Sequence, residues 1–135
     1  MPLRTALVLI TSIIATGLFV AASLLLRNKF RFSRTAIAVG GIHLAAVLIV
    51  AWTIEADMLK LGPSEALLGW LWFDIADLPS SLLQLPAIML LRSFLLREVL
   101  FPILFFGVLG SLQYLALAEM IARFLARRPD PSKRA

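Results

Sequence analysis

Cysteine is absent from this chain of 135 residues, and histidine and tyrosine each occur once. The lack of cysteine excludes disulfide bonds, iron–sulfur clusters, thiolate metal sites and thiol nucleophiles. Charged residues are also scarce, at 16% of the sequence, whereas a typical soluble domain carries about 25%. No stripe of basic residues interleaved with stacking aromatics occurs, so nucleic acid is not an expected partner.

Hydrophobic residues make up 61% of the sequence. A soluble protein of this length leaves a large share of its surface wet, so it could not bury so many apolar side chains. A lipid bilayer is the environment that accepts them. We therefore expect an all-α integral membrane protein that crosses the plasma or inner membrane several times.

Four apolar stretches have about the 20 residues that a helix needs to cross a hydrocarbon core of roughly 30 Å. Residues 5–26, 35–54 and 99–118 contain no Asp, Glu, Lys or Arg. We expect one domain over residues 1–126, a compact bundle of four hydrophobic helices. Its helices are predicted at about 5–26, 35–54, 65–96 and 99–125, with a polar basic tail at 127–135.

The third stretch differs from the others because Asp74, Asp77, Pro79 and Pro86 interrupt it. Proline lacks the N–H that a helix interior requires, and it disfavours helical geometry at the preceding residue, here Leu78. We predict a helix that is broken or strongly kinked near Pro79.

The number of crossings stays open at this point. The segment RNKFRFSR at 27–34 and the C-terminal end are both rich in Lys and Arg, which predicts a cytoplasmic position for each. Four crossings would put these two segments on opposite faces, whereas three crossings plus a re-entrant helical hairpin would put them on one face. Four crossings is the preferred interpretation, because re-entrant hairpins are rarer than an imperfect charge bias.

Asp74 and Asp77 are candidate site residues, because they lie one helical turn apart on one face. At a cavity inside the membrane, such a carboxylate pair would hold a proton or a cation. At the head-group boundary it would simply face water, with Trp70, Trp72 and Phe73 in the interfacial aromatic belt. We favour the boundary, because the apolar parts of the other helices offer no Lys or Arg to neutralise a buried pair.

His43 lies at helical spacing from Ala36, Gly40 and Val47, so small residues surround it on one face. We expect a neutral imidazole that hydrogen-bonds to a neighbouring helix; haem ligation and proton relay are the alternatives. The other polar side chains expected to bond between helices are Gln84, Gln113 and Tyr114. The small residues expected in packing seams are Gly17, Ala21, Gly40, Gly41, Ala45, Gly107 and Ser111.

Catalytic motifs such as HExxH, GxSxG, a Walker loop or a dinucleotide fingerprint are missing. We therefore expect no enzyme activity, no metal and no cofactor. The leading hypothesis is a non-catalytic subunit, anchor or scaffold of a membrane complex or homo-oligomer, with lipid and protein as partners. One alternative is a small transporter or channel that uses Asp74 and Asp77 at the broken helix. A further alternative is a haem- or quinone-associated electron-transfer subunit that uses His43.

Overall fold

The fold is an all-α bundle, described by a computed structural model for residues 2–58, 70–78, 80–83 and 100–127. Within these ranges every regular element is helical. The elements are α1 (Leu3–Phe30), α2 (Arg34–Met58), α4 (Leu71–Ala76), the 3-10 turn η2 (Ser80–Leu83), α6 (Phe101–Leu104), the π-helical η4 (Phe105–Gly110) and α7 (Ser111–Ala126).

Among the described residues, three helices are long and apolar enough to cross a membrane: Leu3–Phe30, Arg34–Asp57 and Phe101–Ala126. The third of these consists of α6, η4 and α7 joined end to end. The predictions of helices at 5–26 and 35–54 are confirmed, as is the prediction for the last apolar stretch from Phe101 onward. Each helix continues past its charge-free run into polar residues, as expected where a helix reaches the head groups.

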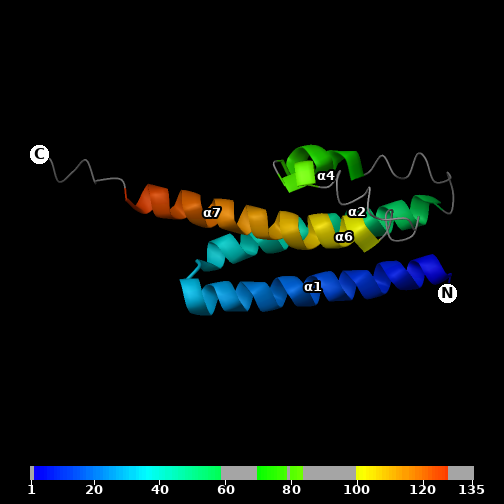
Figure 1. The fold of residues 1–135 in the computed structure, drawn as a ribbon, viewed down its shortest axis with the longest axis horizontal. Coiled ribbons are helices and arrows are strands. Elements are labelled where there is room, and N and C mark those ends of the chain that lie inside the picture. The colour runs from blue at the N-terminus through cyan, green and yellow to red at the C-terminus, as the bar shows by residue number, and fades with distance from the viewer. Residues whose placement is uncertain (1, 59–69, 79, 84–99, 128–135) are drawn as a thin grey trace, which may run out of the picture.

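The helix α1 ends at a reversal that returns the chain into α2. Arg31 adopts a left-handed backbone conformation with φ 54°, and its N–H donates to the carbonyl of Arg27 over 3.1 Å. This residue closes the last turn as a C-terminal cap does. The reversal makes α2 antiparallel to α1, and the last spanning helix then runs in the direction of α1 (Figure 1).

The helix α2 ends, and α6 begins, at the same end of the bundle (Figure 1). There Arg4 Nε lies 2.6 Å from Glu55 Oε2, and Ile103 lines the same small hollow as these two residues. At the other end, the N–H of Ser33 donates to Glu119 Oε2 over 2.8 Å. The end of α2 and the start of α6 thus lie at the Arg4–Glu55 end of the bundle, and the Ser33–Glu119 contact marks the opposite end.

The predicted break near Pro79 is confirmed by the residues described on either side of it. The helix α4 ends at Ala76, a turn follows at Asp77 and Leu78, and η2 then begins. The predicted helical pieces before Trp70 and after Leu83, including Gln84, lie outside the described residues.

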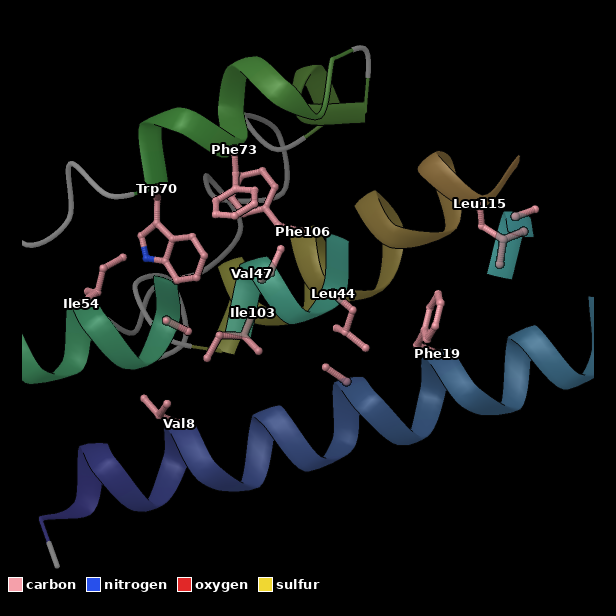
Figure 2. Packing of buried hydrophobic residues seen from close by; sticks show 13 residues of the cluster. Val8, Phe19, Leu44, Val47, Ile54, Trp70, Phe73, Ile103, Phe106 and Leu115 are labelled. Carbon is pink, nitrogen blue, oxygen red and sulfur yellow. The ribbon is translucent and has the colours of Figure 1, made fainter. Parts of the chain in front are cut away.

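The apolar core connects α1, α2, α4 and the last spanning helix (Figure 2). From α4, Trp70 and Phe73 point into the bundle, where Phe106 lies 5.9 Å and 5.8 Å from their ring centroids. Ring pairs of this kind add about 0.5–1.5 kcal/mol beyond their buried area. Trp72 on the opposite side of α4 remains 76% exposed, so only one face of this short helix docks.

Candidate functional site: a His–Asp pair in the middle of the bundle

His43 of α2 and Asp77, in the turn after α4, meet inside the bundle. His43 Nε2 lies 2.8 Å from Asp77 Oδ1, and the side chain of Asp77 is 0% exposed. The other ring nitrogen of His43, Nδ1, lies 3.2 Å from the hydroxyl of Ser111; which of these two atoms donates depends on the tautomer. Three separate parts of the chain thus meet at this imidazole. We call the imidazole of His43 and the carboxylate of Asp77 the His43–Asp77 pair.

The His43–Asp77 pair lies near mid-depth of the bundle. Along α2, His43 comes ten residues after Ser33 and twelve residues before Glu55. At 1.5 Å per residue these separations are about 15 Å and 18 Å. Ser33 and Glu55 belong to the polar clusters at the two ends, so the clusters are about 33 Å apart, close to the thickness of a hydrocarbon core. The helix α4 starts at the Glu55 end, where Trp70 lines a hollow with Arg4 and Glu55, and it reaches the middle at Asp77.

Side chains of α7 hold the end of α4 in place. The hydroxyl of Tyr114 donates to the carbonyl of Ala76 over 2.8 Å, and Gln113 Nε2 donates to the carbonyl of Leu78 over 2.9 Å. The last carbonyls of a helix have no partner within it, so these bonds satisfy groups that would otherwise be costly away from water. The Tyr114 ring also stacks on His43 with its centroid 4.4 Å away.

Gly110 provides the space that the Asp77 carboxylate occupies. A Cβ atom built on Gly110 would overlap Asp77 Oδ2 and would lie 2.9 Å from His43 Cε1. A side chain at this position would therefore push the carboxylate away from the imidazole.

We expect Gly110→Ala to lower the free energy of unfolding by about 1–3 kcal/mol, the usual range for overpacking a filled interior. Gly17→Ala is the matched control, because nothing lies within 4 Å of a Cβ built there. Alanine is the better helix former by about 1 kcal/mol, so the control should be neutral or stabilising. Unfolding by SDS in mixed micelles, followed by circular dichroism, measures both; equal effects would contradict this role of Gly110.

The position of Asp77 differs from the water-facing site expected from the sequence. Its carboxylate is fully buried, whereas Asp74, one turn earlier, is half-buried. The expectation considered only Lys and Arg as partners, whereas the structure places the single histidine 2.8 Å from Asp77 Oδ1. Trp70 and Phe73 are core residues rather than members of an interfacial belt.

The small residues expected in packing seams divide into two groups. Gly40 and Gly107 lie where α2 packs on the last spanning helix: a Cβ on Gly40 would be 2.8 Å from the Ser111 carbonyl, and one on Gly107 would be 3.3 Å from Leu44 Cδ1. Ser111 is buried in the same seam and Gly41 is half-buried. In contrast, the residues on exposed faces are Gly17, Ala21 and Ala45. Gly17 and Ala21 are exposed because the face of α1 that packs into the bundle carries other residues, among them Val8, Ser12, Ala15, Phe19 and Ser23.

Polar clusters at the two ends of the bundle were not anticipated. Glu55 accepts from Arg4 Nε and, over 2.7 Å, from the hydroxyl of Thr5. At the opposite end, Glu119 accepts from Ser33 and, over 2.7 Å, from Arg123 Nε. The spacing of Glu119 and Arg123 is a readable i,i+4 signal. The contact of Arg4 with Glu55 spans 51 residues and has no local signature.

Ser111, His43 and Asp77 follow the order of a nucleophile, a base and an acid, but the geometry does not suit acyl transfer. In hydrolase triads the acid bonds to Nδ1 and the serine to Nε2, whereas the contacts of His43 are reversed. Ser111 is also completely buried within a helix, so a substrate carbonyl has no approach to its hydroxyl. The described residues include no group of three His, Asp or Glu side chains placed to hold a metal ion.

The sequence matches no protein-family model, and neither a curated protein nor a solved structure is detectably similar to it. The chain is a small helical membrane protein. Its helices of 28, 24 and 26 residues have the length and hydropathy for spanning, and its distinctive chemical feature is the His43–Asp77 pair.

Proposed function

We propose that the protein is a non-catalytic membrane subunit that crosses the bilayer three times and responds to protons through the His43–Asp77 pair. The observation that carries this proposal is the 2.8 Å contact of a fully buried carboxylate with the only histidine, located where α4 ends. Ionisable groups inside a membrane segment are costly and usually serve a function.

The proton count of the pair sets its charge. With one proton between them, the two side chains are neutral in sum, whether as imidazolium and carboxylate or as imidazole and carboxylic acid. A second proton leaves a net charge of +1, and loss of the first leaves −1. Charge is costly away from water, so a change in the net charge of the pair changes the stability of the docked state. Among the described residues, Tyr114 on α7 is a titratable group in contact with the pair, because its ring stacks on the imidazole.

The helix α4 is the element that a change of charge would move. It has only six residues, too few to be stable alone, and one of its faces is exposed. Its docked position depends on the aromatic contacts of Phe73, the two bonds from Gln113 and Tyr114, and the His43–Asp77 pair. A charged pair would gain hydration if α4 withdrew from the bundle, so proton occupancy and docking are coupled.

A single-cysteine probe at Ser81 tests this coupling, since the natural chain has no cysteine. Ser81 is buried in η2, and cysteine is nearly isosteric with serine. We expect reaction of Ser81→Cys with a membrane-impermeant maleimide to be slowest near neutral pH and about tenfold faster at acid pH. A tenfold change corresponds to a docking equilibrium weakened by about 1.4 kcal/mol.

The control for the probe is Asn28→Cys, an exposed position on α1. Dividing the rate at Ser81 by the rate at Asn28 removes the intrinsic pH dependence of thiol reactivity. In a background that carries both Asp77→Asn and His43→Gln the ratio should not vary with pH, because neither side chain can then take up a proton in this range. The same pH profile in the natural background and in this double variant would refute the proposal.

A proton-coupled transporter is the second candidate, because a short helix ending at mid-depth beside ionisable groups is typical of transporters. Proteoliposomes with an imposed pH gradient and an internal pH dye distinguish it: a flux that Asp77→Asn abolishes supports transport. The haem alternative gains no support, since both ring nitrogens of His43 contact protein groups.

The subunit role and orientation are parts of the same proposal. The exposed small residues Gly17 and Ala21 on α1 would let another helix approach closely. Chromatography with light scattering in a mild detergent tests whether the chain assembles with itself or with companions. Segment 27–34 and the C-terminal end of α7 are proposed to face the cytoplasm, in the plasma or inner membrane.

A further inference from the structure

We infer that a groove beside the C-terminal half of α7 binds the head group of an anionic phospholipid. The α7 groove, as we call it, is lined by Phe32, Glu119, Met120, Arg123, Phe124 and Arg127. It lies apart from the His43–Asp77 pair and does not depend on the proposed function.

The groove combines an apolar wall with two guanidinium groups. Phe32, Met120 and Phe124 line the apolar wall, and Met120, which is 60% exposed, can contact an acyl chain. The Arg123 guanidinium lies over the Phe32 ring, 5.6 Å from its centroid. Arg123 is already oriented: its Nε donates to Glu119, and its Nη2 donates to the Phe30 carbonyl over 3.0 Å.

Arg127 supplies the available charge, because it is exposed and has no ion-pair partner among the described residues. A guanidinium group binds phosphate oxygens through two parallel hydrogen bonds. The groove therefore offers a phosphate a fixed arginine and a free one.

The position along the membrane axis suits a head group. Glu119 belongs to the polar cluster that ends the mid-membrane region, and Arg123 and Arg127 follow it by four and eight residues. These separations are about 6 Å and 12 Å along the helix, which is the head-group layer outside a hydrocarbon core of roughly 30 Å.

The charge of this end favours an anion. The basic residues on α1 and α2 that share this end are Arg27, Lys29, Arg31 and Arg34. The only described acid that lines the groove, Glu119, is already bonded to Arg123 and to Ser33. The acids Glu55 and Asp57 lie at the opposite end of α2. An anionic phospholipid, rather than a zwitterionic one, is the complementary occupant.

Native mass spectrometry of the full chain, released from micelles containing either phosphatidylglycerol or phosphatidylcholine, tests the site. We expect the natural chain to retain one phosphatidylglycerol in preference to phosphatidylcholine. Arg127→Gln should weaken that binding by about fivefold, which is the effect of about 1 kcal/mol per basic residue near a membrane surface. Arg127 is exposed at the end of its helix, so the variant should fold normally.

Arg27→Gln is the matched control, because it removes the same charge from the same end of the bundle but does not line the groove. We expect it to change binding less than twofold. Equal losses for Arg27→Gln and Arg127→Gln would overturn the site in favour of diffuse surface charge. Equal retention of the two lipids, or displacement of phosphatidylglycerol by inorganic phosphate at equal concentration, would also overturn it.

Discussion

Asp77→Ala is expected to lower the free energy of unfolding by about 2 kcal/mol. Breaking a buried pair in a soluble protein costs about 3–5 kcal/mol, whereas single polar contacts between membrane helices contribute about 0.6 kcal/mol on average and 1.7 kcal/mol at most. The value lies between these limits because alanine also removes the anchor of α4 and leaves His43 buried with Ser111 as its remaining polar partner. Unfolding by SDS in mixed micelles measures the change.

Asp77→Asn separates charge from shape. The amide has the shape of the carboxylate beside Gly110 and keeps a polar atom next to the imidazole, so we expect less than half the loss seen with alanine. A double-mutant cycle of Asp77→Ala and His43→Ala isolates the energy of the pair itself. A coupling energy near zero would mean that the 2.8 Å contact contributes nothing to docking, and that the aromatic contacts and the bonds from Gln113 and Tyr114 hold α4.

The spanning helices were predictable because the bilayer imposes their length. A charge-free run of about 20 residues has few other stable solutions, and the helices begin or end within a few residues of the nearest charged groups, such as Arg4 and Arg34. The break near Pro79 was predictable for a similarly local reason, since proline cannot donate the helical hydrogen bond.

The His43–Asp77 pair was not predictable, because its members are 34 positions apart and each looks ordinary in its own segment. The sequence suggested an interface for Asp77, since no cationic partner was visible near it. The pairing depends on where α4 docks, and docking depends on Gly110 leaving a space and on Gln113 and Tyr114 binding the end of α4. These are tertiary contacts without a local pattern.

The small-residue patterns show a related limit. Gly17 and Ala21 have the same spacing as Gly107 and Ser111, yet only the second pair lies in a seam within the chain. Spacing identifies a face that permits close approach. It does not identify the partner, because that depends on which faces the neighbouring helices and any companion protein occupy.

Single cysteines at Asn28 and Ser132 are expected to react from the same side of the membrane. Asn28 lies near the end of α1, and Ser132 follows the C-terminal end of α7 by only a few residues in the sequence. Glu119 joins these two ends through its bond to Ser33. In intact cells both cysteines should be protected from an impermeant thiol reagent, and both should react after permeabilisation, because Lys and Arg concentrate on the cytoplasmic side.

Asp57→Cys, at the other end of α2, is the control and should react in intact cells. The labelling pattern answers two questions separately: the number of crossings and the orientation of the chain. Agreement between positions 28 and 132, on whichever side, means an odd number of crossings, and position 57 then gives the orientation. Opposite labelling at 28 and 132 would mean four crossings and would contradict the bundle geometry. The distribution of Lys and Arg also predicts the same labelling at positions 28 and 132. Segment 27–34 and the C-terminal tail can both face the cytoplasm only if an odd number of crossings separates the N-terminus from the tail. This condition is met when α2 ends and α6 begins at one end of the bundle.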